Sequence, residues 1–316
     1  MGDIFVSSIP FACMEQGISR YSLVTPAFNE ETNIRRLVES VNSQTEKPLE
    51  WIIVNNGSTD DTVKILKRII SLHEISYIKI VNCARNLDLA SHENISNSTI
   101  VGFNEAMASL DDSVKYIGNL DADVVLPKFF FEMLCDALDV NETYGAVSGQ
   151  SYTCPGYSLP TFCNKALVNC QKDIIARDSL RNIRLYRIES LESVGGMPYV
   201  RYSQDSAILY LLRSAGWGTK MCKSVPFILV RETTSMRQTE ENAMKAGRIA
   251  YYYQSSFFHL TMQILYEVLI WKSLMPLKSF SGYFKSAEAH DEIAPAEILE
   301  ARAREKTILN LVKSLI

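Results

Sequence analysis

Two aspartates, Asp121 and Asp123, follow the stretch VKYIGNL (114–120), whose apolar residues predict a buried strand. In extended backbone, residues i and i+2 project to the same side, so the two carboxylates can converge on one point where the strand leaves the sheet. Oxygen ligands of this kind suit Mg²⁺ or Mn²⁺, which bridge protein carboxylates to phosphate oxygens. The alternative, which holds for most Asp-x-Asp triplets, is that Asp121 caps a turn and Asp123 is only solvated.

The elements around this triplet predict an α/β protein with a mainly parallel sheet, because short apolar strands alternate with helical patterns through the first half of the chain. Strands are expected at 21–26, 49–57, 77–83, 114–120 and 144–150, and helices at 29–44, from Ser58 onward, at 97–110, after Pro127 and at 203–214. Ser58, with Asp61 three residues later, resembles a capping box. The polar segments TPAFNEE, VNNGSTDD and NLDADVV each follow a strand, so they are expected at the ligand-binding edge of the sheet.

The C-terminal part of the chain is expected to be mostly helical. The expected organisation is therefore an N-terminal arm (1–19), a catalytic domain (20–235) and a C-terminal helical extension (236–316). Its most apolar stretch, 251–271, is long enough to span a bilayer, but polar residues such as Gln263 and Glu267 interrupt it. A helix buried against the catalytic sheet is the favoured interpretation. A helix on the membrane surface is the alternative, with peripheral membrane contact through the C-terminal helices.

Charge and cysteine content exclude several classes. The formal charge of −4 argues against a nucleic-acid binder, which usually has a basic surplus. The N-terminal residues show no basic start before a long apolar core, so no secretory signal is expected. Seven scattered cysteines fit a reducing compartment. A cytoplasmic protein, with the inner face of the membrane as a possible site of action, is therefore expected.

The three polar segments also support a resemblance. In order and separation, TPAFNEE, VNNGSTDDT and NLDADVVLP resemble the motifs of family 2 glycosyltransferases, which commonly read T-x-P-x-Y-N-E-E, V-D-D-G-S-T-D-x-T and D-A-D. The stretch 185–217, with its Gly-Gly turn, is similar to the family's acceptor-side pattern. The likeness covers about residues 20–230. It implies the nucleotide-diphospho-sugar transferase (glycosyltransferase A) fold, a Rossmann-like, mostly parallel sheet flanked by helices, here with a C-terminal helical extension.

The resemblance implies roles for particular residues on the donor side. Nucleotide-sugar binding is implied for Thr25, Pro26, Ala27, Phe28, Glu30, Asn55, Asn56, Arg85, Asn104, Asp121, Ala122 and Asp123, and metal binding for Asp121 and Asp123. Asn55 and Asn56 stand where the family usually has an Asp pair, and an amide can both donate and accept, so the base preference is open. Helix capping is an alternative for Glu30, and a surface salt bridge for Arg85.

On the acceptor side, the resemblance implies roles for Gly195, Gly196 and Gln204, and makes Asp205 the general base that deprotonates the acceptor hydroxyl. Gln204 replaces the family's usual Glu. The alternative for Asp205 is an acid favoured by the helix dipole in a first turn, with Ser203 as N-cap. Many relatives add a histidine to the metal site, but the stretch VPFILVRETTSMRQ contains none, and Arg231 and Arg237 are candidates to contact the diphosphate instead.

The resemblance therefore implies an inverting glycosyltransferase that uses Mg²⁺ or Mn²⁺ to move a sugar from a nucleotide-diphosphate sugar to a sugar, polysaccharide or lipid-linked acceptor. One rival is a sugar-phosphate nucleotidyltransferase, which would normally need a Gly-rich basic loop that TPAFNEETN lacks. The other is a catalytically degenerate protein that binds a sugar nucleotide or a partner.

Overall fold

The computed structural model of this chain describes residues 20–82, 92–110, 113–154, 157, 162, 171–172, 180, 182–231 and 239–313, without the side chains of 92–99, 171–172 and 306–313. Its described strands form one mixed sheet in the order β3-β2-β1-β4-β8-β6-β9-β5, with β7 beside β6. They are β1 (Tyr21–Ala27), β2 (Trp51–Asn55), β3 (Ile78–Asn82), β4 (Tyr116–Leu120), β5 (Val124–Val125), β6 (Tyr144–Thr153), β7 (Gln171–Lys172), β8 (Ile183–Arg187) and β9 (Gly218–Leu229).

The parallel half of the sheet comes from the first half of the chain. Strand β1 pairs in parallel with β2 and β4, and β2 pairs in parallel with β3. The carboxyl ends of β1, β2 and β4 therefore lie along the same edge, where the three polar segments begin. Strand β8 then inserts antiparallel between β4 and β6. The expected α/β fold with a mostly parallel sheet is confirmed.

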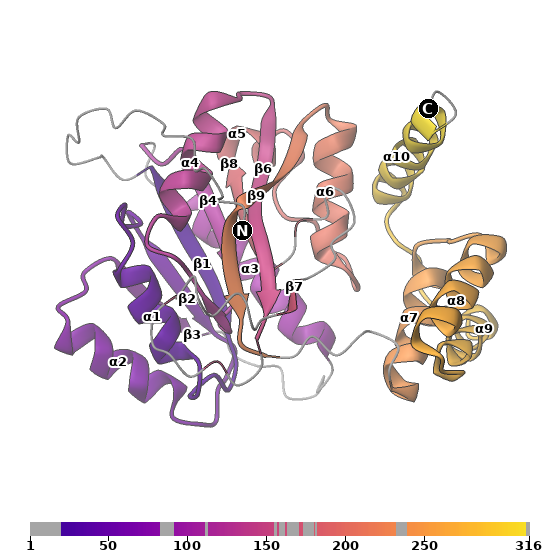
Figure 1. Cartoon of the computed structure of the whole chain (residues 1–316), viewed down its shortest axis with the longest axis horizontal. Helices are drawn as coiled ribbons and strands as arrows, with labels where there is room; N and C mark the ends of the chain where they lie inside the picture. The colour runs from indigo at the N-terminus through magenta and orange to yellow at the C-terminus, as the bar shows by residue number, and fades with distance from the viewer. Residues whose placement is uncertain are drawn as a thin grey trace, which may run out of the picture.

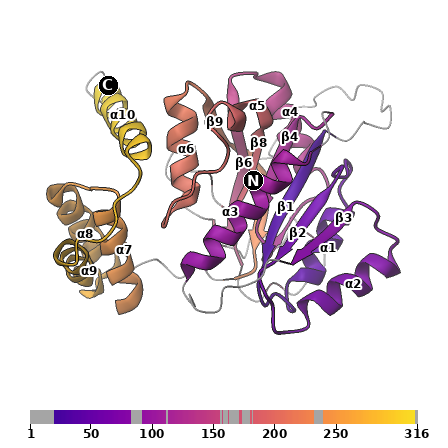
Figure 2. The same cartoon turned by 180° about the vertical axis from the view of Figure 1, so that it is seen from behind.

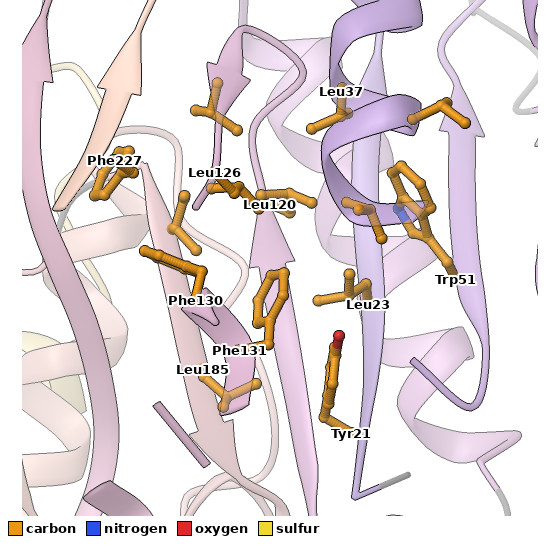
Figure 3. Close-up of a cluster of buried hydrophobic side chains, with 14 of the residues drawn as sticks. Tyr21, Leu23, Leu37, Trp51, Leu120, Leu126, Phe130, Phe131, Leu185 and Phe227 are labelled. Carbon is orange, nitrogen blue, oxygen red and sulfur yellow. The ribbon is translucent and has the colours of Figure 1, made fainter. Parts of the chain in front are cut away.

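Helices cover both faces of this sheet (Figures 1 and 2). One face carries α1 (Ile34–Asn42), α2 (Thr62–Leu72) and α4 (Phe130–Val140), and the other carries α3 (His92–Ala108), α5 (Ile188–Glu192) and α6 (Gln204–Ser214). Figure 3 shows the core of the first face, where the rings of Tyr21 and Phe131 stack with their centroids 4.7 Å apart and Leu23 lies between them and Trp51. Alternation along β1 explains the two layers, because Leu23 belongs to this core while Val24 belongs to the opposite one.

Three predicted helix starts were wrong, and one of them is that of α3, which begins at His92 rather than at 97. Helix α1 begins at Ile34 rather than at 29, because Asn29 adopts a left-handed conformation with φ of 54°. Helix α2 begins at Thr62 rather than at Ser58. The capping box expected there does not form, and the Asp60 carboxylate instead accepts the Thr62 backbone N–H at 3.0 Å.

The C-terminal helices are α7 (Glu240–Tyr252), α8 (Phe257–Trp271), the 3₁₀ turn η2 (Met275–Leu277), α9 (Lys278–Glu288) and α10 (Ala296–Lys313). Figure 1 shows α7, α8 and α9 grouped beside the sheet domain, while α10 returns alongside α6. Arg213 of α6 pairs with Glu305 of α10 at 2.5 Å. No described helix combines the length and the apolar character needed to cross a bilayer.

Burial of α8 against the catalytic sheet, the favoured interpretation from sequence, is wrong. Only Leu260 and Ile264 of this helix are buried, and the helix packs against η2. The apolar residues were correctly placed in a helix, but their periodicity gave no information about which side the rest of the chain would cover.

Two glycines let α7 and α9 cross in backbone contact. A Cβ at Gly247 would lie 1.9 Å from the Ser279 carbonyl oxygen, and one at Gly282 would lie 2.0 Å from the Met244 carbonyl oxygen. These distances are far below van der Waals contact, and backbone atoms cannot rotate away as a side chain could. The two helices therefore require glycine at both positions.

Gly282→Ala is expected to destabilise the helical extension by about 2–3 kcal/mol, because overpacking outweighs the roughly 1 kcal/mol that alanine contributes to helix propensity. Urea unfolding and limited proteolysis of the C-terminal helices measure the effect. Ser281→Ala, at a half-buried neighbouring position, is the matched control and should unfold like the unaltered chain. Equal stability of the two variants would mean that α7 and α9 do not approach this closely.

Candidate active site

A pocket of about 430 Å³ opens at the carboxyl ends of β1 and β4. Ten of the residues predicted from sequence line it, namely Pro26, Phe28, Glu30, Asn56, Asp121, Ala122, Asp123, Gln204, Asp205 and Arg231. Residues more than 170 positions apart in the chain thus meet around one cavity. The donor-side and acceptor-side residues predicted from separate motifs belong to a single site.

The acidic pair occupies the end of β4. Asp121 accepts a hydrogen bond from the Asn182 side chain at 3.1 Å. Burial, followed by the charges of Asp123 and Asp205, raises the pKa of Asp121 to about 7, against the opposing effects of Arg184 and Asn182. Burial also raises the pKa of Asp123, with Arg231 opposing it. The excess negative charge at this point is what a divalent cation would neutralise.

These two carboxylates fit Mg²⁺ or Mn²⁺. Such ions keep several waters and share the rest of their coordination with substrate phosphates, so two protein carboxylates with open positions are a sufficient set. Among the residues that the structure describes, no group of three or more His, Cys, Asp or Glu side chains is arranged to hold a metal. The fit of the site to such a cation therefore rests on the two carboxylates of Asp121 and Asp123.

Asp121→Asn is expected to stabilise the metal-free protein at pH 8. The folded-state pKa lies near 7 and the unfolded value near 3.8, so the unfolded chain loses this proton first as pH rises. This group therefore lowers stability progressively between about pH 4 and 7, and the full penalty is present above pH 7. After allowance for solvent screening, the gain should be about 1–3 kcal/mol at pH 8 and near zero at pH 4.

Urea unfolding in EDTA at both pH values measures this difference. Asp61→Asn, at a 61% exposed carboxylate paired only with Lys64 at 3.6 Å, is the control and should change little at either pH. If the difference in unfolding free energy between Asp121→Asn and the unaltered chain were the same at both pH values, the Asp121 carboxyl would already be ionised at neutral pH.

Glu30 and Arg231 form the next polar contact along the pocket. One guanidinium nitrogen of Arg231 lies 2.8 and 2.7 Å from the two carboxylate oxygens of Glu30, and its Nε lies 3.7 Å from Asp123. Glu30 also accepts a hydrogen bond from Asn33 at 2.8 Å. Arg231 thus places a cationic group, 57% exposed, against the acidic pair. A guanidinium here is suited to the phosphate oxygens of a donor.

The first two motifs also hold each other in place. Asn29 donates its backbone N–H to Ser58 at 3.1 Å and accepts the Thr59 N–H at 2.9 Å. Glu31 donates its backbone N–H to Asp60 at 3.1 Å. These contacts join the loop after β1 to the loop after β2. The polar residues of both motifs therefore position the part of the pocket next to β1 and β2.

Several predicted donor residues lie beside the pocket instead of lining it. Thr25 is fully buried and accepts a hydrogen bond from the Trp51 indole at 2.9 Å. Asn55 donates to Asn82 at 2.8 Å and accepts the Ser58 N–H at 3.0 Å. Ala27 is part of the core. Arg85 lies outside the described residues.

The predicted acceptor turn is held by Asn104. Its amide donates to the Met197 carbonyl at 3.0 Å and accepts the Met197 N–H at 2.9 Å. Gly195 and Gly196 have φ of 78° and 87°, which glycine adopts without strain. A Cβ at Gly196 would lie 2.9 Å from the Asn104 oxygen. Asn104 and the glycines thus bring Met197, which does line the pocket, into position.

Asp205 lies in the first turn of α6 and faces the pocket. Its two carboxylate oxygens each lie 2.8 Å from a guanidinium nitrogen of Arg184. Arg184 is 1% exposed, whereas Asp205 is 63% exposed. Ser203 occupies the expected N-cap position, but its φ is 51° and its side chain makes no capping hydrogen bond. The ion pair, rather than a cap, fixes this end of the helix.

Arg184 and the apolar wall of the pocket are functional features that the motifs in the sequence do not predict. A signal for Arg184 existed, because a charged residue between the apolar residues of a strand needs a buried partner. The apolar wall comprises Ile100, Phe103, Met197 and Ile208. Nothing distinguishes these side chains in the sequence from ordinary core residues.

The open α/β sheet, with an acidic pair and a facing aspartate in a pocket beyond its parallel strands, has the arrangement expected of the glycosyltransferase A fold. The sequence model of glycosyl transferase family 2 matches residues 22–194, more than half of the chain, so the chain belongs to this family. The family resemblance and the enzyme class that it implies are confirmed at this level.

Particular relatives match shorter segments. An uncharacterized glycosyltransferase of Haemophilus influenzae is 30% identical over 121 residues, which are 38% of this chain and 33% of that protein. An undecaprenyl-phosphate 4-deoxy-4-formamido-L-arabinose transferase of Proteus mirabilis is 31% identical over 113 residues, 35% of this chain and 31% of that protein. The chain thus spans about a third of these relatives' lengths.

A solved structure shows the same fold. The mannosyltransferase PcManGT of Pyrobaculum calidifontis, in complex with GDP-Man and Mn²⁺, superposes with a TM-score of 0.53 over 92% of this chain and 80% of its own, at 15% identity. At this identity the likeness establishes the architecture alone.

Proposed function

We propose that the chain is an inverting glycosyltransferase that moves a sugar from a nucleotide-diphosphate sugar to an acceptor hydroxyl. The observation that supports this most directly is the meeting of Asp121 and Asp123 with Asp205 in one pocket. The catalytic unit is residues 20–235, with 236–316 as an extension. The relatives are named for sugar transfer, and the neighbour's GDP-Man and Mn²⁺ support a sugar nucleotide and a divalent cation as ligands.

The donor is bound at the ends of β1, β2 and β4. Pro26 and Phe28 offer apolar surface beside Asn56, while Arg231 supplies positive charge for the diphosphate. Asp121 and Asp123 would hold Mg²⁺ or Mn²⁺. When bound, such a cation neutralises the charge that develops on the departing diphosphate.

Asp205 acts from the acceptor side. It accepts the proton of the acceptor hydroxyl as that oxygen bonds to the anomeric carbon, while the bond from this carbon to the diphosphate oxygen breaks. Attack opposite the leaving group inverts the configuration, and no covalent sugar-enzyme intermediate forms. The apolar side chains of Met197 and Ile208 shape the acceptor end of the pocket. The acceptor is a sugar, a polysaccharide or a lipid-linked molecule, and the protein acts in the cytoplasm.

One observation favours the rival in which the chain only binds a sugar nucleotide. Both oxygens of Asp205 already contact Arg184, and Asn55, Asn56 and Gln204 replace residues that are acidic in the family pattern. The ion pair does not block catalysis, however. Each carboxylate oxygen has two lone pairs, and a bidentate contact engages one on each.

The test is to incubate the purified chain with a panel of nucleotide sugars and Mn²⁺ and to measure free nucleoside diphosphate. Release that requires the cation and stops in EDTA supports the proposal. Tight binding without release would instead indicate a degenerate member. Pyrophosphate release from a nucleoside triphosphate would indicate a nucleotidyltransferase.

A further inference from the structure

Helix α8 exposes an apolar face to solvent. Its exposed large side chains include Phe257, Phe258, Met262, Leu265, Tyr266, Leu269 and Ile270, and Leu274, Leu277 and Phe284 continue the surface onto η2 and α9. Phe258 is 74% exposed and Leu269 is 77% exposed. This apolar face, which we name the α8 face, is the reverse of an ordinary surface helix, whose polar side faces water.

Charge around the α8 face selects the kind of surface that it fits. From Phe257 to Glu288, the end of α9, the chain carries three lysines, Lys272, Lys278 and Lys285, against two acids, Glu267 and Glu288. Lys272 and Lys285 are exposed, while Lys278 pairs with Glu240 at 2.9 Å. Exposed aromatic and aliphatic side chains bordered by lysine are typical of helices that lie in the interface of an anionic bilayer.

The α8 face is mechanically linked to the acceptor side of the pocket. Tyr252 and Tyr253 end the helix that precedes α8. The Tyr253 hydroxyl donates to the Tyr202 carbonyl at 2.6 Å, and the Tyr252 hydroxyl accepts the Arg201 N–H at 3.1 Å. Residues 201 and 202 lead directly into Gln204 and Asp205. These hydrogen bonds therefore hold α8, and any surface that it binds, at a defined position and orientation relative to the proposed catalytic base.

We propose that the α8 face docks on an anionic membrane surface, with the helix lying in the plane of the interface. On the proposed function, this orientation favours an acceptor carried at the membrane surface. The docking itself requires no catalysis, so it can be tested apart from sugar transfer.

Vesicle co-sedimentation of the full chain tests the proposal. Binding to neutral phosphatidylcholine vesicles is compared with binding to anionic vesicles that contain about 30% phosphatidylglycerol. The unaltered chain should bind the anionic vesicles at least about tenfold more tightly than the neutral ones. Met262→Gln/Leu269→Gln should reduce that binding at least about tenfold, because two apolar side chains leave the interface and glutamine preserves the helix. Lys272→Gln/Lys285→Gln should weaken it to a similar extent, and high salt should do the same.

Val140→Gln is the matched control, since Val140 is 88% exposed but lies at the end of α4 on the sheet domain. It should bind vesicles like the unaltered chain. Absence of vesicle binding by the unaltered chain would overturn the proposal. If sedimentation velocity then showed a dimer that Met262→Gln/Leu269→Gln dissociates, a second copy would be the true occupant of the α8 face.

A separate observation concerns Arg184. Its guanidinium is buried, donates through Nε to the Leu180 carbonyl at 3.0 Å, and grips both oxygens of Asp205. Arg184 lies opposite Asn119 on the neighbouring strand β4. Asn119 is two positions before Asp121 in the chain. One hydrogen bond and one ion-pair contact, made by two different guanidinium nitrogens, hold the two oxygens of the Asp205 carboxylate.

We infer that Arg184 is a positioning residue for Asp205, an inference that rests on the proposed function. Arg184→Lys keeps the charge but loses the two parallel contacts, so kcat should fall at least about tenfold while the Kd for nucleoside diphosphate and Mn²⁺ stays within about threefold. Arg184→Met should lower kcat further. In the Asp205→Asn background, Arg184→Met should cause no additional loss, because a residue that acts through Asp205 has nothing left to position.

Thermal unfolding of each variant separates a folding defect from a catalytic one. Arg184→Lys with unchanged kcat would overturn the inference, and so would an Arg184→Met effect of the same size with and without Asp205. An unaltered chain that transfers no sugar would overturn the proposed function instead, together with this role.

Discussion

Asp205→Asn is expected to lower kcat for sugar transfer by about 10²–10⁴-fold, which is the range lost when a positioned general base is removed. An amide cannot accept the acceptor proton at neutral pH, whereas the donor contacts at the ends of β1, β2 and β4 remain. The Kd for nucleoside diphosphate with Mn²⁺ should therefore stay within about threefold of the unaltered value, so the loss should appear in kcat. Steady-state kinetics together with calorimetric titration measure both quantities.

Arg184 complicates this variant and must be controlled. An Asn at 205 keeps one oxygen for the buried guanidinium but turns an N–H toward its second nitrogen, so some stability is lost along with the base. Circular dichroism melting should show a folded protein with a reduced Tm. Glu300→Gln, at a 70% exposed carboxylate on α10, controls for loss of one negative charge. Near-normal turnover in a folded Asp205→Asn variant would exclude the assigned role.

The sequence predicted much of the pocket because its residues follow strands. Asp121, Asp123, Glu30 and Asp205 each lie close to an element boundary that apolar periodicity locates. Parallel pairing of β1, β2 and β4 then brings most of these boundaries to one edge. The arrangement follows from local pattern and from the general rule for open sheets.

Within each motif, it was harder to predict which residues line the pocket and which point into the protein interior. Thr25 and Pro26 are adjacent on β1, yet Thr25 contacts Trp51 in the interior while Pro26 lines the pocket. Asn55 and Asn56 divide similarly, since Asn55 is bonded to Asn82 and Asn56 reaches the cavity. A motif treated as one block hides this alternation. Assigning each residue its side of the strand would have divided both pairs correctly.

The partners of Asp205 depend on topology that no local pattern encodes. Arg184 reaches Asp205 because β8 inserts antiparallel beside β4. The order of strands in the second half of a sheet is set by long-range packing, which periodicity does not report. The direction of the apolar side of α8 was unpredictable for the same reason.

Asp121→Asn/Asp123→Asn is expected to abolish Mn²⁺ binding and the Mn²⁺-dependent part of nucleotide binding. At an effective dielectric constant of about 20, each carboxylate next to a divalent cation contributes several kcal/mol. The loss should therefore exceed about 100-fold in affinity. Calorimetric titrations with MnCl₂, and then with UDP or GDP in the presence of Mn²⁺ and of EDTA, measure it, with Asp61→Asn as the control.

The pKa of Asp121 sharpens this experiment in two ways. Because burial and the neighbouring carboxylates raise it to about 7, protons compete with the cation, so Mn²⁺ affinity of the unaltered chain should weaken as pH falls below 7. Neutralising the pair also removes a repulsion from the metal-free fold, so the double variant should be more stable than the unaltered chain at pH 8. Unfolding therefore cannot explain its loss of Mn²⁺ binding. Undiminished Mn²⁺ and nucleotide binding in this stable variant would remove the acidic pair from the site and, with it, the basis of the proposed mechanism.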